Sequence, residues 1–412
     1  MQGQEPALIE DCLLPSVPLI FDMHTSNHST SRRRLLKALP FATIGLGTAL
    51  PEFVHGQEPT TDKPQSALQS RVKSIDVTLR RRRPNPDPIR DALQSLPGVG
   101  NVVVTITSDE GITGQGDIGY GRIAGGLDAL KALIEHELTP IVQGTRLSHI
   151  RQTHEAMRKE TDYHGTQGLA TLGIAAVDTA LWDCLGKTLN VPCWQIWGGC
   201  HGSIPAYGML GWINYTEDQL KERCEQALAQ GYRALKLKVG FPSLKEDVKR
   251  IEFVRKIIGD DVRLMVDANQ VLTVGEAIMR GRVFEELGCW WFEEPIPAHD
   301  LEGYRRINEE IGIQLATGEN LFSPQDFGRF IRHNAVDIVQ PDLRRSGGPT
   351  ALLELGHLSN ACTIPYASHG GGAAHMNVMA CLPNVIYVET GGTDHLVDGR
   401  LKLPQGPGFS WD

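Results

Sequence analysis

The sequence lacks the features that mark several large classes of protein. Its eight cysteines contain no CxxC pair and are too sparse for a disulfide scaffold in 412 residues, so we expect them to be buried as small apolar side chains. The 40 Lys and Arg are outnumbered by 49 Asp and Glu, and this net charge of −9 argues against a nucleic-acid binder. With 41% hydrophobic and 22% charged residues, the composition also excludes a coiled coil, a disordered chain and a polytopic membrane protein.

Several catalytic motifs are absent or incomplete. The chain has no GxSxG motif, and His136-Glu137 lacks the second histidine of a zinc-protease helix. Gly114, Gly116 and Gly119 match the dinucleotide fingerprint, but they follow a predicted hairpin and open no βαβ unit. We therefore expect a mobile glycine loop there, over the functional site.

The amino terminus predicts an export signal. Ser31–Lys37 carries three arginines before Leu-Leu-Lys, and Ala38–Leu50 is a run of 13 mostly apolar residues, a layout that resembles a twin-arginine signal. We expect residues 1–56 to be extension and signal, residues 57–70 a linker, and the protein to be exported by the twin-arginine machinery. The run is too short for stable membrane insertion, which needs about 20 residues. A chance basic run is the alternative, and it would leave the protein in the cytoplasm.

Residues 71–202 have the mixed pattern of an α+β domain. Val102–Thr107 and Ile112–Gly114 flank a Ser-Asp-Glu-Gly turn and predict a hairpin. Three helical stretches follow, at Gly126–Leu138, Ser148–Lys159 and Gly168–Leu189.

Residues 203–390 repeat a strand and a helix. Apolar runs of strand length recur every roughly 20 to 30 residues between amphipathic stretches, which favours a (β/α)-barrel. Because the eighth run is followed by a proline-rich tail, residues 391–412, we expect a modified TIM barrel of (β/α)7β type, with an N-terminal α+β capping domain on which the tail packs. The runs are Ile204–Leu210, Leu235–Val239, Leu264–Asp267, Trp290–Glu293, Gln314–Gly318, Val336–Gln340, Ile364–Ala367 and Val385–Val388.

Charged residues follow nearly every predicted strand at its carboxyl end, where barrels place their chemistry. The packing of buried strands does not require ionised groups at so many successive strand ends. Their repetition at equivalent positions therefore argues against the alternative that they are only ion pairs at the protein surface. The residues are Lys236, Lys238, Asp267, Glu293, Glu294, Glu319, Asp342, His369 and Glu389.

Three of these carboxylates predict a metal site. Asp267, Glu293 and Glu319 are spaced by 26 residues each (293 − 267 and 319 − 293), one strand–helix unit apart. Converging carboxylates repel one another unless a cation lies among them, and oxygen ligands without His or Cys favour Mg²⁺, or Mn²⁺, over zinc.

The remaining strand ends predict acid–base chemistry. Lys236 and Lys238 lie two apart on a strand and point to the same face, so their mutual repulsion and a nearby cation should lower the pKa of both. Asp342 should orient His369 and raise its basicity. Glu389 is a candidate proton donor, which requires that burial raise its pKa.

With these residues in place the chain resembles the enolase superfamily, specifically its mandelate racemase-like subgroup, over roughly Arg71 to Asp412. The first domain contributes Ala176–Asp183, which looks like the helix that precedes the family's barrel. The matching barrel stretches are Lys236–Gly240, Val266–Gln270, Glu293–Pro295, Thr317–Glu319, Gln340–Asp342 with Gly347-Gly348, and Ser368-His369.

The resemblance implies abstraction of the proton alpha to a carboxylate, through an enediolate. The metal and Lys236 would hold the carboxylate, Lys238 and His369 would face opposite sides of the alpha carbon, and Glu389 would stabilise the developing charge.

Differences from neighbouring subgroups favour the type with Lys and His bases. Asn269 stands where galactonate dehydratases carry a histidine, and Arg344 and Arg345 follow Asp342 where muconate-lactonising enzymes and dipeptide epimerases carry a lysine. The favoured type contains both racemases and acid-sugar dehydratases.

The family's substrate choice lies in loops of the capping domain, here Arg80–Pro97 and Asp117–Gly126, with Tyr163, His164 and Thr166 as further candidates. The first loop is arginine-rich with little aromatic lining, which favours a polyhydroxy acid. We therefore predict a Mg²⁺-dependent acid-sugar dehydratase that forms a homo-oligomer and binds a small carboxylate. A 2-hydroxy-acid racemase and a non-catalytic carboxylate-binding protein are the alternatives.

Overall fold

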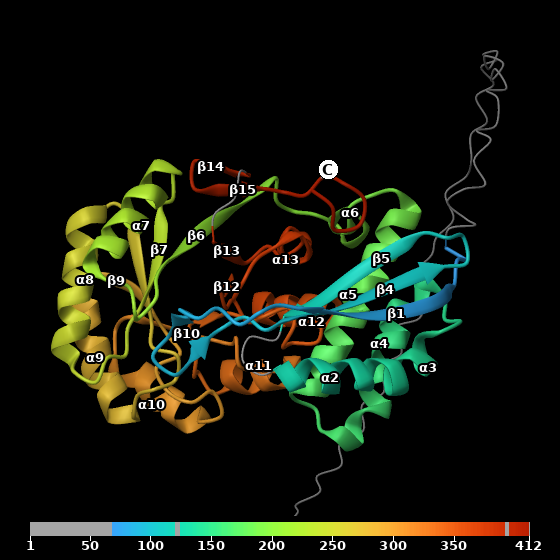
Figure 1. Ribbon diagram of the computed structural model, residues 1–412. Helices are drawn as coiled ribbons and strands as arrows, with labels where there is room; N and C mark the ends of the chain where they lie inside the picture. Colours follow the sequence, from blue (N-terminus) through green and yellow to red (C-terminus); the bar gives the residue numbers. More distant parts are fainter. Residues whose placement is uncertain (1–67, 120–123, 392–394, 412) are drawn as a thin grey trace, which may run out of the picture. The chain divides into compact units, whose positions relative to one another are not determined.

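The computed structural model describes residues 68–119, 124–391 and 395–411 (Figure 1). The predicted signal at residues 31–50, the N-terminal extension and all but three residues of the predicted linker lie outside the described residues. Residues 120–123, in one of the two loops expected to select the substrate, also lie outside them.

An antiparallel sheet opens the capping domain, in the order β1 (Val72–Arg81), β4 (Gly100–Ser108), β5 (Thr113–Gly119). Strands β4 and β5 form the predicted hairpin, with Val102 opposite Ile118. A second, short hairpin of β2 (Ile89–Arg90) and β3 (Ser95–Leu96) interrupts the chain between β1 and β4. In Figure 1 this blue segment extends from the capping domain to the barrel.

Helices cover the capping sheet, and the longest, α5, is buried on nearly all sides. Among the described residues it is the one helix long and apolar enough to cross a membrane, but 89% of its apolar window is buried inside the protein, as in a core helix. The helices are α2 (Ala124–Leu133), η1 (Ile134–Leu138), α3 (Thr139–Val142), η2 (Leu147–His149), α4 (Ile150–Glu160), η3 (Asp162–His164), α5 (Leu169–Leu189) and α6 (Cys193–Trp197).

The glycines that match a dinucleotide fingerprint have another role, so the predicted mobile loop is wrong. Gly114 and Gly116 lie within β5, where their backbone touches α5. A Cβ atom on Gly116 would come within 2.0 Å of the Ala176 carbonyl oxygen, and one on Gly114 within 2.2 Å of the Cys184 nitrogen. The glycines therefore let the sheet and the helix pack at close range.

Eight parallel strands close into the predicted barrel, since β13 pairs with β6 as well as with β12. Four of the connecting helices, α7, α9, α10 and α11, begin with a side chain that caps the first turn; for example, Ser323 caps α11 with Pro324 at its first position. The strands are β6 (Ser203–Gly211), β7 (Ala234–Lys238), β8 (Arg263–Asp267), β9 (Cys289–Glu293), β10 (Gln314–Thr317), β11 (Ile338–Val339), β12 (Tyr366–Ala367) and β13 (Val385–Thr390); the helices are α7 (Glu217–Ala229), α8 (Leu244–Ile258), α9 (Val274–Glu286), α10 (Leu301–Glu310), α11 (Pro324–Arg332), α12 (Pro349–Ala361) and α13 (Ala373–Met379).

The barrel interior is apolar below its carboxyl end. A buried layer fills it with one side chain from each of seven strands, among them Met265 and Trp291. Asp267 and Glu293 lie two residues further along the same strands, so they point to the same interior face one level higher. The apolar layer thus closes the barrel interior beneath the charged groups.

The chain after the barrel contacts both domains. Strands β14 (Leu396–Val397) and β15 (Arg400–Lys402) form a hairpin, and β15 pairs antiparallel with β6. The Phe409 N–H donates to Asp183 of α5 at 2.9 Å.

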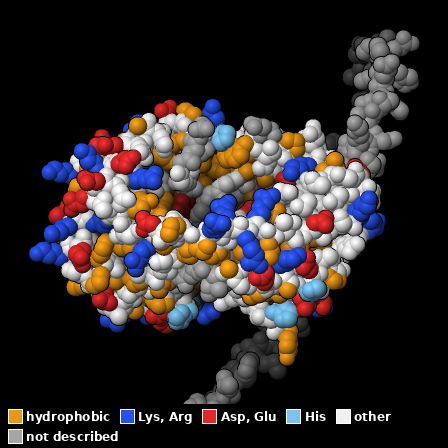
Figure 2. Space-filling model, viewed as in Figure 1, with side chains coloured by type: hydrophobic (Ala, Val, Ile, Leu, Met, Phe, Trp, Pro, Cys, Tyr) orange, Lys and Arg blue, Asp and Glu red, His pale blue; other side chains and the backbone are white. Residues whose placement is uncertain are grey.

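Two cysteines differ from the expectation that all are buried. Cys200, in the connection to β6, and Cys362, at the end of α12, are exposed, while the other described cysteines are buried. On the face shown in Figure 2, Lys and Arg side chains are mixed with Asp and Glu over much of the surface, and several Lys and Arg side chains gather near the middle.

Candidate active site

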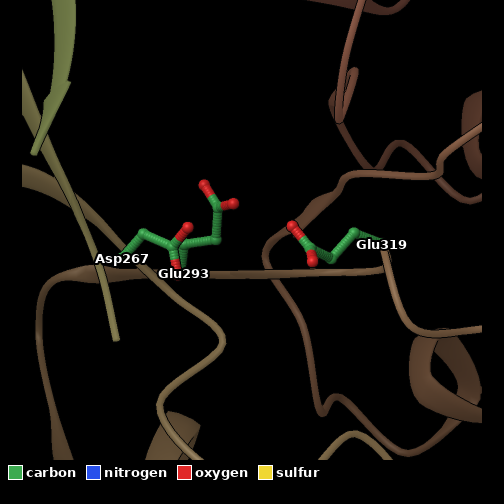
Figure 3. A group of neighbouring side chains, drawn as sticks. All are labelled: Asp267, Glu293 and Glu319. Carbon is green, nitrogen blue, oxygen red and sulfur yellow. The ribbon is translucent and has the colours of Figure 1, made fainter. Parts of the chain in front are cut away.

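Three carboxylates from neighbouring strands converge at the carboxyl end of the barrel. Asp267 ends β8, Glu293 ends β9 and Glu319 follows β10, and one oxygen from each lies within 4.8 Å of the others. Figure 3 shows Asp267 and Glu293 close together and Glu319 reaching toward them from the other side. All three are buried, with exposures of 0%, 1% and 6%.

The residues around this acidic triad (Asp267, Glu293 and Glu319) fit a Mg²⁺ ion. Its donors are hard oxygens, and three protein ligands leave positions for water or a substrate. The Gln340 amide donates to Glu293 Oε2 at 2.9 Å, and the Asn269 backbone N–H donates to Asp267 Oδ1 at 2.9 Å, so neighbouring groups orient two of the carboxylates. Burial and the nearby Asp267 raise the pKa of Glu293 to about 8, the electrostatic strain that a bound cation relieves.

The backbone turns sharply just beyond two of the predicted ligands. Asn269 has a φ of 46° and Glu294 one of 39°, in the left-handed region that residues other than glycine rarely adopt. Such conformations gather at functional sites, where the surrounding structure holds them.

Two lysines from β7 neutralise the triad. Lys236 Nζ donates to Glu293 at 2.8 Å and lies 3.4 Å from Glu389, while Lys238 Nζ donates to Asp267 at 2.5 Å. Burial alone would lower the pKa of each lysine, but the carboxylates outweigh it and hold both above their usual value. The predicted fall assumed a cation at the triad, and the ion pairs with these carboxylates act in the opposite direction.

His369, after β12, is held at both ring nitrogens. Nδ1 lies 2.8 Å from Asp342 Oδ2, and Nε2 lies 3.0 Å from Glu319 Oε2. Burial alone would lower its pKa, but these two carboxylates raise it to about 10, so the predicted gain in basicity is confirmed. Arg344 binds the same Asp342 oxygen at 2.6 Å and fixes the carboxylate.

The contacts of Glu389 lower its pKa, whereas the prediction required a raised one. Its Oε2 accepts hydrogen bonds from the Tyr207 hydroxyl at 2.9 Å and the Gly370 N–H at 3.0 Å, and Lys236 lies beside it. Burial alone would raise its pKa, but Lys236 and His369 lower it to about 2. The prediction considered burial without these partners.

A cavity of about 730 Å³ lies above these groups, between the barrel and the capping domain. Lys238, Glu319 and His369 line it, together with Asn269, whose buried Oδ1 has no hydrogen-bond partner. Cap residues of the hairpin and of the start of α5 complete the wall, among them Asp91, Gln94, Gly168 and Leu169.

Three of the predicted substrate-binding residues are not brought to this cavity. Tyr163 is 97% exposed, and His164 lies near Glu137 on the surface, 3.8 Å away. Thr166 lines a separate, much smaller cavity. The chain passes the cavity a few residues later, at Gly168, Leu169 and Leu172.

The cavity wall also differs from the predicted arginine-rich lining. None of Arg80–Arg83 lines it; the arginines that do are Arg344 and Arg345, from the barrel. Asp91 lies in the loop Arg80–Pro97, which is expected to select the substrate, but the sequence does not single it out. Sequence reasoning missed Trp212, because one aromatic residue in a loop carries no distinguishing pattern. It also missed the apolar part of the wall, which is formed by Leu93, Leu96, Leu169, Leu172, Trp212 and Phe322.

Comparisons with known proteins agree with this geometry. Residues 74–198 match the family described as mandelate racemase / muconate lactonizing enzyme, N-terminal domain, and residues 219–412 match the enolase C-terminal domain-like family. Arabinonate dehydratase of Saccharolobus solfataricus is 35% identical over 78% of this chain and 91% of its own length.

Two solved structures extend the likeness to the fold. A racemase from Streptomyces coelicolor with bound magnesium is 31% identical, with a TM-score of 0.77 over 82% of this chain and 96% of that one. An L-talarate dehydratase from Polaromonas, in complex with Mg and L-glucarate, is 28% identical, with a TM-score of 0.73 over 82% of this chain and 93% of that one.

Proposed function

Because the chain belongs to the mandelate racemase / muconate lactonizing enzyme family of the enolase superfamily, we propose that it is the acid-sugar dehydratase of that family predicted from its sequence. The family's enzymes are Mg²⁺-dependent lyases and racemases, and this chain is one of them. The proposed reaction converts an aldonic or aldaric acid to a 2-keto-3-deoxy acid.

One observation carries the proposal: two candidate bases reach one cavity from different sides, above the triad. Lys238 ends β7 and His369 follows β12, and β6 and β13 separate these strands in the closed sheet. Both side chains and Glu319 line the cavity. A substrate carboxylate held at the triad would thus present its alpha carbon between them.

Three side chains of the protein have different roles in the proposed reaction. Lys236 holds the substrate carboxylate, together with Mg²⁺, which when bound stabilises the negative charge that develops there. Lys238 Nζ takes the alpha proton in its neutral form. His369, in its protonated form, gives the Nε2 proton to the hydroxyl on the next carbon; the C–O bond breaks, water leaves, and the enol product becomes the 2-keto acid.

A racemase is the second candidate, and the apolar part of the wall favours it. Trp212, Leu93 and Phe322 would suit a substrate with a less polar side chain. With the same two bases, a proton taken by Lys238 would be returned by His369 to the opposite face. The third reading, a protein that binds carboxylates without catalysis, is not favoured because every group of the set is retained.

The test is NMR of the purified protein with Mg²⁺ in D₂O, against aldonic, aldaric and aromatic 2-hydroxy acids. A 2-keto-3-deoxy product would support the dehydratase, and loss of the alpha proton without that product would support the racemase. Loss of neither, with the fold intact by circular dichroism, would contradict both.

Export by the twin-arginine route is part of the same proposal. Replacing Arg32, Arg33 and Arg34 together by lysine should keep the protein in the cytoplasm, because the receptor reads the arginine pair. Cell fractionation of the two forms measures this, and equal export of both would contradict it.

A further inference from the structure

A buried carboxylate of the capping domain lies on the wall of the active-site cavity. Asp91, at the tip of the β2–β3 hairpin, is 5% exposed and lines the cavity together with Gln94 and Lys238. We propose that Asp91 and Gln94 bind a hydroxyl group of the substrate beyond its alpha carbon and so select aldonic acids, which have one carboxylate, over aldaric acids, which have two. This inference rests on the proposed function and names its substrate class.

The turn that carries Asp91 is rigid. Asp91 Oδ1 accepts the backbone N–H groups of Leu93 at 2.8 Å and Gln94 at 2.7 Å, and the Asp91 N–H donates to the Gln94 carbonyl at 3.0 Å. The Gln94 side chain also contacts the carboxylate. Both backbone N–H groups bind Oδ1, so Oδ2 takes part in neither of these bonds and can accept a hydrogen bond from a ligand.

The barrel holds the hairpin beside Lys238. The Ile213 N–H donates to the Arg90 carbonyl at 2.8 Å, and the Arg90 N–H donates to Asn214 at 3.0 Å, which ties the hairpin to the connection after β6. On the other side, a Cβ atom on Gly240 would come within 3.0 Å of Ala92, so the hairpin tip also touches the connection after β7. These contacts fix the hairpin, and Asp91 with it, at the mouth of the barrel.

The charges near Asp91 favour a neutral hydroxyl donor. Burial raises its pKa, and Lys238 is the cation that opposes this. The hydrogen-bond partners of Asp91 on the hairpin are the backbone N–H groups of Leu93 and Gln94 and the Gln94 side chain. A substrate hydroxyl supplies a further donor, whereas a second carboxylate would add a like charge in a buried place.

The arginines on the same wall do not call for a second carboxylate. Arg344 binds Asp342 at 2.6 Å, and Arg345 donates to the Glu319 carbonyl at 3.2 Å and to the Asn320 side chain. Both are thus engaged by groups of the chain itself, across the cavity from the β6 and β7 connections that hold Asp91.

The experiment compares matched acids in the wild type, D91N and D87N. The panel contains the pentonates and hexonates of all configurations, each with the aldarate that differs only in its terminal carbon, and the readout is loss of the C2 proton in D₂O with Mg²⁺. Asparagine keeps the Oδ1 acceptor and hence the turn, but it removes the charge. Asp87, exposed on the same segment, gives the matched control.

We expect the wild type to prefer the aldonate of its best pair by about tenfold or more in kcat/KM. In D91N, kcat/KM for the aldonate should fall about tenfold, mainly through a higher KM, and the ratio of kcat/KM between aldonate and aldarate should become smaller. D87N should behave as the wild type. A wild-type preference for the aldarate, or an unchanged preference in D91N, would overturn the inference and leave the dehydratase standing. If the folded wild-type protein exchanges the C2 proton of no acid in either class, the proposed function fails and the inference fails with it.

Discussion

The two candidate bases of the cavity are held in different ways. Lys238 donates to Asp267, a member of the acidic triad, so its nearest charge partner belongs to the metal site. His369 contacts Glu319 of the triad but has a second partner, Asp342, that lies outside it. Asp342 is itself bound by Arg344 and by the backbone N–H groups of residues 344 and 345.

This difference shows how one site can prepare two bases for opposite tasks. The charge on Lys238 depends on what the triad holds, because a cation there competes with the ammonium group for Asp267. The orientation of His369 depends on Asp342, whatever the triad holds. A cation at the triad should therefore affect both bases, Lys238 through Asp267 and His369 through Glu319, but leave in place the Asp342 contact that orients the His369 ring.

The substitution that removes a contact of the metal site and a contact of His369 together should reduce activity most. Glu319→Gln removes a charged oxygen from the triad and the carboxylate that contacts His369 Nε2, so we expect turnover to fall by about three orders of magnitude or more. Turnover and Mg²⁺ binding by calorimetry measure it, with Glu354→Gln on the exposed surface as control. Full activity in Glu319→Gln would show that the triad is not the metal site.

Removing one base should separate the two sides. Lys238→Ala and His369→Asn should each abolish alpha-proton exchange from one face, with losses of about 10²–10⁴-fold on that face. Exchange of the C2 proton is followed separately in D₂O for the two C2 epimers of one acid, so that each epimer measures proton removal from one face of the alpha carbon. If either variant still exchanged both epimers at wild-type rates, that residue would not be a base.

Asp342→Asn tests the orientation of the histidine alone. An amide can present its N–H to Nδ1 and favour the wrong tautomer, so exchange on the His369 face should fall by about 10- to 100-fold. Exchange on the Lys238 face should be unchanged in the same sample, which is the internal control. An equal loss on both faces would indicate general damage instead of lost orientation.

Glu389 links the site to the stability of the fold in acid. Its pKa is lowered to about 2, so its ionised form stabilises the folded state above its ordinary titration range near pH 4.5, and this stability is lost as the pH falls toward 2. Glu389→Gln should cost about 3 kcal/mol of unfolding free energy at neutral pH and flatten the decline in Tm below about pH 4.5. Parallel Tm curves for the two proteins would contradict this.

The strand ends could be predicted from the sequence and the cap lining could not. Parallel barrel strands end at one rim, so spacing alone brings Asp267, Glu293 and Glu319 together. The ionisation of Lys236 and Glu389 depends on which atoms touch, and the alternation of strands and helices does not contain that information. The cap hairpin is a loop whose place depends on contacts with two barrel connections, and no periodicity marks it.

Tyr163 gives the smallest expected effect and the sharpest test of that distinction. The sequence places it near the domain junction, but its side chain is 97% exposed and lies off the cavity, which the chain meets at Leu169 instead. Tyr163→Ala should change kcat/KM by less than about twofold, since a solvated side chain contributes little to a distant site. Leu169→Ala, a truncation on the cavity wall, should raise KM. A large loss of kcat/KM in Tyr163→Ala, with no change of KM in Leu169→Ala, would mean that residues 163–166 bind the substrate, as the sequence analysis predicts.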